Sequence, residues 1–252
     1  MKQKIALITG ATAGIGFETA KILSENHFNL IITGRRQDRL EKIQQKLQHE
    51  KCTVQTLCFD VRSKQEVDRA LASLPNKWKK VDVLVNNAGL AAGMDPVNQA
   101  DVNVWDAMID TNIKGLLYMT REVSNWMIAQ KQGHIINISS IAGIEAYPNG
   151  SVYCATKHAV NAISKAMRIE LAPHNIKVGT VSPGAIETEF SLVRFKGDQE
   201  KADQVYQGFT PLNARDIAES IYFVLSRPAH VSINDLLIMP TAQASARDIF
   251  RK

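Results

Sequence analysis

The architecture of this chain follows from residues 5–16, Ile5-Ala6-Leu7-Ile8-Thr9-Gly10-Ala11-Thr12-Ala13-Gly14-Ile15-Gly16. A short apolar run leads into a glycine-rich turn, and a helical pattern begins directly after it. Glycines let the backbone approach a pyrophosphate, and the free N–H groups at the start of a helix favour phosphate. A glycine-rich turn alone is often only a turn, but its place between strand and helix predicts a dinucleotide site. The predicted contacts are Gly10, Thr12, Ala13, Gly14, Ile15 and Gly16.

Short apolar runs alternate with helical patterns along the rest of the chain. Runs rich in Ile, Leu and Val are typical of strands buried on both faces of a parallel sheet. The expected strands are Ile5–Thr9, Leu30–Thr33, Thr53–Phe59, Val81–Val85, His134–Ile138, Lys177–Val181 and Leu236–Met239. The expected helices are Ile15–Asn26, Gln37–Glu50, Lys64–Leu74 (opened by a capping box at Ser63–Glu66), Asp101–Met127, Val152–Ala172 and Arg215–Ser226. This alternation predicts an α/β fold, a single doubly wound Rossmann-type parallel sheet with helices on both faces.

The domain organisation is predicted to be simple. No repeat, low-complexity tract or linker divides the 252 residues, so we expect one domain over residues 1–252. Residues 183–209 are the least regular region, and a long loop of this kind is typical of a substrate lid. Residues 240–252 are expected to form a tail that packs on the body of the protein or on a partner subunit.

Composition argues against several classes of function. The net charge is +5, but acids and bases alternate along the expected helices, so we expect no nucleic-acid partner. Cys52, Cys58 and Cys154 lack metal-type spacing and the histidines are scattered, which indicates reduced thiols and no metal site. No apolar run approaches the roughly 18 residues of a membrane span or resembles a signal peptide. We therefore expect a cytoplasmic protein with no membrane partner.

The end of the second expected strand predicts the cofactor. An NAD-binding unit places Asp or Glu there to hold the ribose 2′-hydroxyl. This chain has Gly34 instead, followed by Arg35 and Arg36, while Asp38 falls in the first turn of the next helix. Because arginine can grip a 2′-phosphate with two parallel hydrogen bonds, the pair predicts NADP(H).

Residues after the third and fourth expected strands extend the predicted nucleotide cleft. Ligands of such sheets bind at the carboxyl ends of the strands. Asp60 and Val61 follow the third strand and are expected to contact the adenine. The turn Asn86-Asn87-Ala88-Gly89 follows the fourth, so its residues Asn87, Ala88 and Gly89 are predicted to bind the cofactor.

Tyr153 and Lys157 form the predicted proton-transfer pair. They lie four residues apart in an expected helix, so both side chains share one face. A tyrosine pKa near 10 is too high for easy proton exchange at neutral pH, but a neighbouring cation lowers it and makes Tyr153 usable as an acid or base. Ser140 is predicted to supply a hydroxyl to the same site, and its neighbour Ser139 would point to the opposite face. Cys154 is interpreted as a packing residue.

Together these motifs resemble the short-chain dehydrogenase/reductase family over essentially the whole chain. The matching residues are Thr9–Gly16, Asn86–Gly89, Asn112, Ser140, Tyr153 with Lys157, and Pro183-Gly184 followed by Thr188. The resemblance implies that Tyr153 exchanges the proton, that Lys157 holds the nicotinamide ribose and lowers the tyrosine pKa, and that Ser140 binds the substrate oxygen. It also implies that Asn112 anchors a water molecule linking Lys157 to solvent. The nicotinamide pocket would be shaped by Pro183, Gly184, Ile186 and Thr188.

Longer stretches resemble the NADP-dependent 3-hydroxy acid dehydrogenases, which oxidise serine, L-allo-threonine and 3-hydroxypropionate-like compounds. These stretches are Thr33–Arg36, Leu84–Met94, Met108–Asn112, Thr188–Asp198 and Ile233–Pro240. The resemblance implies hydride transfer between NADP(H) and a short 3-hydroxy acid, or the matching semialdehyde or ketone, in a homotetramer. Residues 144–150 depart from the pattern of these enzymes.

A substrate carboxylate needs a cation or a set of hydrogen-bond donors, because burying an unpaired anion is costly. Arg194 and Lys196 in the expected lid are the candidates, and Arg194 is preferred for its planar fork. Two other functions stay open. One is NADPH-dependent reduction of another small carbonyl compound, such as sulfoacetaldehyde or a 3-oxoacyl thioester. The other is a non-catalytic NADP-binding sensor, which would not need the intact catalytic set.

Overall fold

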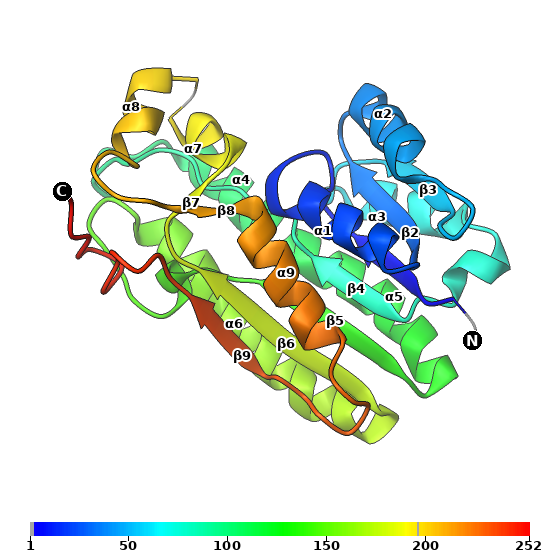
Figure 1. Cartoon of the computed structure of the whole chain (residues 1–252). Helices are drawn as coiled ribbons and strands as arrows, with labels where there is room; N and C mark the ends of the chain where they lie inside the picture. The colour runs from blue at the N-terminus through cyan, green and yellow to red at the C-terminus, as the bar shows by residue number, and fades with distance from the viewer. Residues whose placement is uncertain (1–2, 196) are drawn as a thin grey trace.

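The computed structural model describes residues 3–195 and 197–252. In this part of the chain, seven strands form one parallel sheet in the order β3-β2-β1-β4-β5-β6-β9 (Figure 1). Their bounds are β1 Ile5–Ile8, β2 Asn29–Gly34, β3 Val54–Cys58, β4 Val83–Asn86, β5 Gly133–Ile138, β6 Ile176–Pro183 and β9 Asp235–Ile238. The strand order reverses between β1 and β4, and such a switch point is where open α/β sheets bind ligands. The predicted doubly wound Rossmann-type fold is confirmed.

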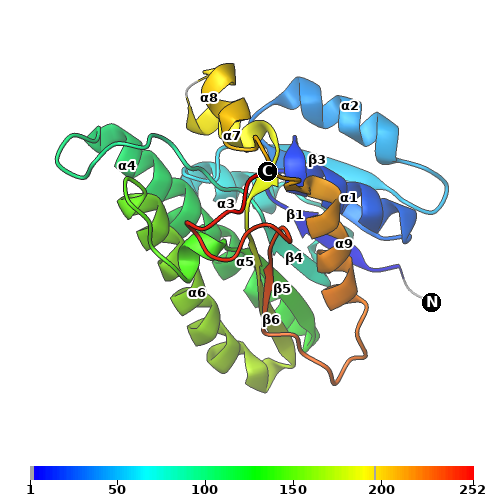
Figure 2. The ribbon, with the colours of Figure 1, turned by 60° about the vertical axis from the view of Figure 1, so that its left-hand side comes forward.

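Helices cover both faces of the sheet (Figures 1 and 2). One face is packed by α1 Gly14–Glu25, α2 Gln37–Leu47 and α9 Ala214–Leu225, and the other by α3 Lys64–Ala72, α5 Leu116–Gln130 and α6 Ser151–Leu171. Along β1, Ile8 contacts the first group of helices and Leu7 the second, and neither side chain is exposed. Each such buried side chain contributes about 1.5–3 kcal/mol of transfer free energy. Cover on both faces explains why the apolar runs do not alternate with polar residues.

The capping box expected at Ser63 is only half formed. The Ser63 hydroxyl accepts a hydrogen bond from the Glu66 backbone N–H at 3.3 Å, as predicted. The Glu66 carboxylate accepts instead from the backbone N–H of Asp60, at 2.9 Å. Glu66 therefore secures the loop after β3 rather than the start of α3.

The helix expected over residues 101–127 is not continuous, which corrects the prediction. It consists of α4 Val102–Ile109, a π-helical turn at Asp110–Gly115, and α5. The turn directs the side chain of Asn112 at the backbone of Leu90, where its Oδ1 accepts from the N–H at 2.7 Å and its Nδ2 donates to the carbonyl at 2.8 Å. A wider turn of this kind is frequent at functional sites. Nothing in the apolar periodicity of these residues indicates it.

The described part of residues 183–209, the segment expected to form a lid and called the lid segment below, contains short regular elements that the sequence did not predict. Strand β7 Ile186–Glu187 pairs with β8 Leu212–Asn213, and helices α7 Glu189–Arg194 and α8 Gln199–Gln204 stand beyond the carboxyl end of β6 (Figure 1). The Tyr206 hydroxyl donates to the Ile186 carbonyl at 2.7 Å. The segment is therefore tied together by its own contacts.

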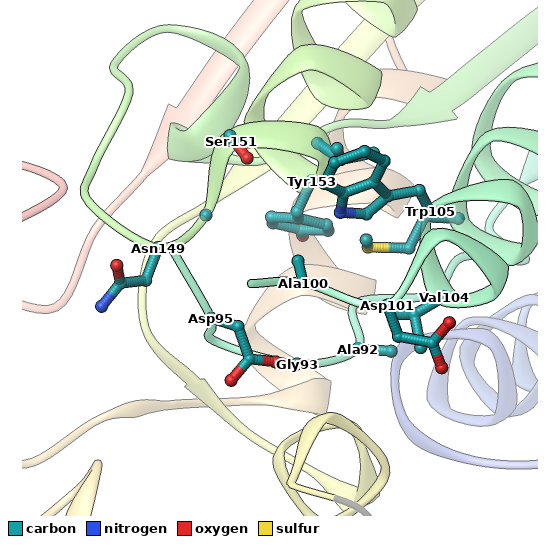
Figure 3. A pocket seen from close by; sticks show the side chains of 13 residues that line it. Ala92, Gly93, Asp95, Ala100, Asp101, Val104, Trp105, Asn149, Ser151 and Tyr153 are labelled. Atoms are coloured by element: carbon teal, nitrogen blue, oxygen red, sulfur yellow. The ribbon is translucent and has the colours of Figure 1, made fainter. Parts of the chain in front are cut away.

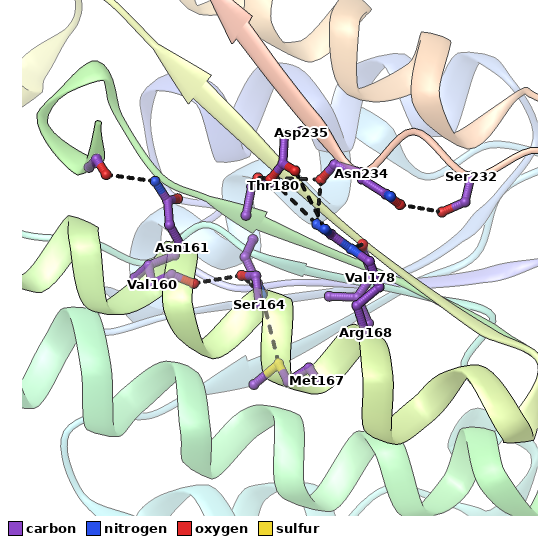
Figure 4. A network of polar contacts seen from close by, with 12 residues as sticks. Val160, Asn161, Ser164, Met167, Arg168, Val178, Thr180, Ser232, Asn234 and Asp235 are labelled. Atoms are coloured by element: carbon purple, nitrogen blue, oxygen red, sulfur yellow. Dashed lines mark hydrogen bonds and ion pairs between the residues drawn. The ribbon is translucent and has the colours of Figure 1, made fainter. Parts of the chain in front are cut away.

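Arg168 on α6 secures the edge strand β9 (Figure 4). Its Nε donates to the Val178 carbonyl at 3.0 Å and its NH2 group donates to the Asn234 carbonyl at 2.8 Å. It also forms an ion pair with Asp235 at 3.4 Å, and Asp235 accepts from the Thr180 hydroxyl at 2.5 Å. Because the ion pair is partly exposed, the bonds to backbone carbonyls are the stronger part of this anchor.

The tail, residues 240–252, packs on the body of the same chain. This was one of the two expected arrangements, the other being packing on a partner subunit. Gln243 is buried, and Lys252 and Arg251 donate to carbonyls of the segment that follows α8, at Gly208 (2.8 Å) and Val205 (3.1 Å). The tail therefore closes against the lid segment. In the described residues, no helix is both long and apolar enough to cross a membrane.

Candidate active site

A cleft of about 760 Å³ opens at the carboxyl ends of the strands. Its wall contains the glycine-rich turn, the arginines after β2, the Tyr–Lys pair and the lid segment. Among the described residues that were predicted for the cofactor, the substrate or catalysis, only Gly16 and Asn112 are absent from this wall. Residues that are distant in sequence but were predicted to act together are therefore brought together.

The glycine-rich turn is held against β4. Gly10 has φ +65°, and a Cβ added there would lie 2.9 Å from the Ala88 Cα. Asn87 Nδ2 donates to the carbonyls of Thr9 (2.9 Å) and Gly10 (3.1 Å). Gly16 packs on the Gly10 carbonyl, which keeps α1 close to the turn although Gly16 does not line the cleft. The backbone here is shaped for close approach by a phosphate group.

The end of β2 carries guanidinium groups and no carboxylate of its own. A Cβ at Gly34 would lie 2.6 Å from the Thr12 Cγ2, so an acidic side chain cannot stand there unless Thr12 moves. Arg36 donates to the Thr12 hydroxyl at 2.9 Å, and Arg35 is exposed at the cleft. Asp38 lies in the first turn of α2, as predicted.

Asp60 and Val61 line the cleft after β3. The Asp60 carboxylate accepts a hydrogen bond from the Nε of Arg62 at 2.9 Å. Burial alone would raise the pKa of Asp60, but the hydrogen bonds and charge of Arg62 lower it. Asp60 is therefore an ionised group whose carboxylate is already engaged, and its contact with an adenine stays a prediction.

Tyr153 and Lys157 are both buried on one face of α6. Lys157 Nζ donates to the Ile138 carbonyl at 2.9 Å, and burial lowers the pKa of this lysine to about 8. Asn112 Nδ2 also donates to the Thr156 hydroxyl at 3.0 Å, in the turn between the two residues. The π-helical turn thus contacts the helical turn that carries Tyr153 and Lys157, through the hydrogen bond from Asn112 to Thr156.

Burial raises the pKa of Tyr153, and the neighbouring Tyr147 raises it further. A hydrogen bond with Ser140 and the charge of Arg194 act in the opposite direction but do not outweigh burial. Lys157 Nζ lies 5.8 Å from the centre of the Tyr153 ring. The net pKa of Tyr153 is therefore raised in the protein alone, because desolvation of the phenolate is the largest effect, and the lowering of this pKa by Lys157 stays a prediction.

Ser140 and Ser139 have different surroundings. Ser140 lies beside Tyr153, and its Oγ accepts from the Ala142 N–H at 3.1 Å. Ser139 is buried, and its hydroxyl points at the Lys157 carbonyl at 3.4 Å. Of the two serines, Ser140 is the one that lies beside Tyr153, and its hydrogen bond to a substrate oxygen stays a prediction.

Arg194 ends α7 and reaches into the cleft beside the tyrosine. Its guanidinium carbon lies 5.8 Å from the centre of the Tyr153 ring and 5.6 Å from that of Tyr147. One terminal nitrogen donates to the Tyr147 hydroxyl at 3.0 Å, and the buried Nε has no hydrogen-bond partner among the described residues. Lys196, the other candidate cation, lies outside the described residues.

The sequence pattern of the short chain dehydrogenase family matches residues 4–198. This chain belongs to that family. It is an oxidoreductase that acts on hydroxyl groups, and the resemblance seen in the motifs is confirmed.

Relatives within the family cover nearly the whole chain. The NADP-dependent 3-hydroxy acid dehydrogenase YdfG of Salmonella typhi is 46% identical over 96% of this chain and 97% of its own length. The NADP-dependent 3-hydroxy acid dehydrogenase of Schizosaccharomyces pombe is 43% identical over 99% of this chain and 97% of its own. Among solved structures, the closed form of a serine dehydrogenase complexed with NADP+ has a TM-score of 0.92 at 44% identity, covering 98% of this chain and 100% of that one. The serine dehydrogenase of Escherichia coli has a TM-score of 0.82 at 39% identity, covering 95% and 99%.

Several residues of this dehydrogenase site were not predicted. Tyr147 belongs to residues 144–150, which were noted only as a departure from the family pattern. Gln243 and Arg247 come from the tail and line the cleft. Gln243 Oε1 accepts from the Ala185 N–H at 2.7 Å, and Glu145 accepts from the Ala246 N–H at 2.8 Å. No local motif marks these residues, because only the fold brings the tail to the cleft.

A second, much smaller cavity is lined in part by Tyr153 (Figure 3). Trp105, Asp101 and Asn149 are among its lining residues, and its volume is about 30 Å³. That volume is close to the roughly 30 Å³ that one water molecule occupies in the liquid. This cavity is therefore too small for a ligand with several non-hydrogen atoms.

Proposed function

We propose that this protein transfers a hydride between NADP(H) and a short 3-hydroxy acid, or the corresponding semialdehyde or ketone. Serine, L-allo-threonine and 3-hydroxypropionate-like compounds are the proposed substrates. The observation that carries the proposal is the guanidinium of Arg194, held beside Tyr153 and Ser140 in the wall of one cleft. The names of the relatives support the same class of substrate.

The cofactor is NADP(H), and the nucleotide end of the cleft fits it. Gly34 leaves no room for the acid that would hold a ribose 2′-hydroxyl, while Arg35 and Arg36 suit a 2′-phosphate. The turn from Gly10 to Gly16 would hold the pyrophosphate, Asp60 to Val61 the adenine, and Asn87 to Gly89 the adjoining ribose. Pro183, Gly184, Ile186 and Thr188 would shape the nicotinamide pocket. When bound, the cofactor supplies the hydride donor or acceptor.

Tyr153 would exchange the proton with the substrate oxygen, and Ser140 would donate a second hydrogen bond to that oxygen. Two donors aimed at one atom stabilise the negative charge that develops on it. The raised pKa keeps Tyr153 protonated at neutral pH, which suits proton donation during carbonyl reduction. Lys157 would hold the nicotinamide ribose with Nζ, and Asn112 would keep Lys157 and its surroundings in place through Leu90 and Thr156.

Arg194 would bind the substrate carboxylate. Its Nε is buried without a described partner, so an anion in the cleft would satisfy a group that is costly to leave unpaired. Tyr147 and the sulfur of Met94 hold the other edge of the guanidinium. The fork is thus oriented before the substrate arrives.

The test compares Arg194→Ala with the matched variant Arg247→Ala, which removes an exposed arginine from the same cleft. For Arg194→Ala we expect kcat/KM to fall about 10- to 100-fold for a 3-hydroxy acid, the range for a charged hydrogen bond. An uncharged alcohol should lose no more than about threefold. An equal loss for both substrates, or an equal effect of Arg247→Ala, would show that Arg194 does not bind the carboxylate.

The same cation would accept a sulfonate, so sulfoacetaldehyde is the second candidate substrate. A panel of 3-hydroxy acids, sulfoacetaldehyde and a 3-oxoacyl thioester, followed by nicotinamide absorbance, ranks the candidates. Tight NADPH binding without turnover of any compound would instead support a sensor.

We also propose a cytoplasmic homotetramer. Apolar side chains are exposed on α5, α6, α9 and the edge strand β9, at Leu117, Ile169, Phe223 and Leu237. Contacts between subunits would cover these exposed apolar side chains. Light scattering coupled to gel filtration measures the mass in solution, and a monomer would contradict the proposal.

A further inference from the structure

Glu189, the first residue of α7, already occupies the meeting point of two arginines. Its carboxylate lies 3.0 Å from the NH1 group of Arg39 and 3.7 Å from the NH1 group of Arg36. Arg39 also donates to the second carboxylate oxygen at 3.2 Å. The lid segment is thereby joined to α2 at the nucleotide end of the cleft.

The two arginines form one cationic site. Arg36 is the N-cap of α2 and Arg39 lies in its first turn, and both guanidinium groups lie against the Glu189 carboxylate. Arg36 is also fixed by its bond to the Thr12 hydroxyl, at the edge of the glycine-rich turn. Glu189 and Arg36 both line the cleft, so the carboxylate contacts the guanidinium predicted to bind the 2′-phosphate.

We propose that Glu189 is an internal substitute for the 2′-phosphate, and that Arg39 is an additional arginine of the phosphate site. This inference rests on the proposed cofactor NADP(H). A phosphate monoester carries a charge of about −1.5 to −2 and three acceptor oxygens, compared with one charge on a carboxylate. The phosphate therefore displaces Glu189 from the arginines, whereas a nucleotide without it leaves the ion pairs in place.

Exposure makes this exchange feasible. The side chains of Arg36, Arg39 and Glu189 are 41%, 39% and 54% exposed, and exposed ion pairs are weak. Glu189 directly follows Thr188, one of the residues expected to shape the nicotinamide pocket. Release of Glu189 from the arginines would therefore free the start of α7, which lies next to the expected nicotinamide pocket. Binding of the 2′-phosphate would in this way be coupled to the lid segment.

The test uses calorimetric binding of adenosine 2′,5′-diphosphate and adenosine 5′-monophosphate, which differ only in the 2′-phosphate and lack the nicotinamide. We expect Glu189→Gln to bind the diphosphate about fivefold more tightly and Arg39→Gln about fivefold more weakly, the size of an exposed charge effect. Neither variant should change the affinity for the monophosphate by more than about twofold. The controls are Arg215→Gln and Glu219→Gln, which remove an exposed ion pair on α9 that lies outside the cleft lining and should change neither affinity.

Two kinds of failure are distinguishable. If the unsubstituted protein binds both nucleotides equally, the proposed NADP(H) preference is wrong. If it prefers the diphosphate but Glu189→Gln binds that ligand no more tightly, Glu189 does not compete with the phosphate. An equal change in affinity for both nucleotides would also overturn the proposal, because the substitutions would then act through the overall charge of the surface and not through the 2′-phosphate.

Discussion

The two ends of the cleft are built in opposite ways. The nucleotide end uses backbone from a glycine-rich turn and exposed guanidinium groups, all supplied by β1, α1, β2 and α2. The proposed substrate end uses the buried side chains of Tyr153 and Lys157 on α6, together with the half-buried Arg194 at the end of α7. Water screens the charges of the first end, whereas burial shifts the pKa values of the second. Recognition and chemistry are therefore separable by substitution.

Tyr153→Phe should break the substrate end and leave the nucleotide end intact. Loss of the proton donor is expected to lower kcat about 10²- to 10⁴-fold, the range for general acid–base catalysis. Binding of adenosine 2′,5′-diphosphate should be unchanged. Steady-state kinetics and calorimetry measure the two effects, and a variant that keeps more than a tenth of its activity would refute the role of Tyr153.

The double variant Arg35→Gln/Arg36→Gln should have the reverse effect. Removing two charged donors is expected to weaken NADPH binding about 30- to 100-fold, while NADH binding changes little. NADPH fluorescence titration measures the affinity, and Arg215→Gln serves as the control for loss of a surface charge. Equal weakening of both nucleotides would mean that these arginines do not bind the 2′-phosphate.

Burial at the substrate end should be visible as a pH dependence of stability. The pKa of Lys157 is about 8 in the folded protein, and that of an unfolded lysine is near 10.4, so between these values the unfolded chain binds more protons. The free energy of unfolding should therefore rise as pH increases, by about 2 kcal/mol from pH 8 to 9.5 without nucleotide.

Lys157→Met should abolish this rise, as measured by urea unfolding at the two pH values. The window ends below pH 10, where Tyr153 begins to contribute in the opposite direction, since its folded pKa is raised. The same slope in the variant would show that Lys157 is not the group that titrates.

The smallest expected effect concerns the orientation of Arg194. Tyr147→Phe keeps the ring but removes the hydroxyl that accepts from the guanidinium at 3.0 Å. We expect KM for the hydroxy acid to rise about fivefold, which corresponds to one hydrogen bond, with kcat unchanged. A matching rise in KM for an uncharged alcohol would indicate a general change in the shape of the pocket.

The comparison also explains what the sequence could predict. The nucleotide end is made of consecutive residues, so Gly10–Gly16 and the Arg35–Arg36 pair could be interpreted from local spacing. The catalytic pair has a helical spacing of its own, and its placement on one face of α6 was predictable. These features depend on the spacing of residues that are close in the sequence, and that spacing can be interpreted without knowledge of tertiary contacts.

The remaining features depend on tertiary contacts. Tyr147, Gln243 and Glu189 reach the cleft only because residues 144–150, the tail and α7 fold over it. The raised pKa of Tyr153 results from burial, which cannot be judged from the lysine four residues away. The π-helical turn at Asn112 is held by Leu90, a partner on another segment.

The contact between Gly34 and Thr12 limits how this cofactor preference can change during evolution or engineering. Gly34→Asp alone would force its Cβ to within 2.6 Å of the Thr12 methyl carbon, so the first step toward NAD would damage the glycine-rich turn. Thr12→Ser removes that methyl group and keeps the hydroxyl that binds Arg36. The order of the two substitutions therefore matters. Gly34→Asp can be accommodated after Thr12→Ser has removed the methyl group, but it produces a steric clash when it is made first.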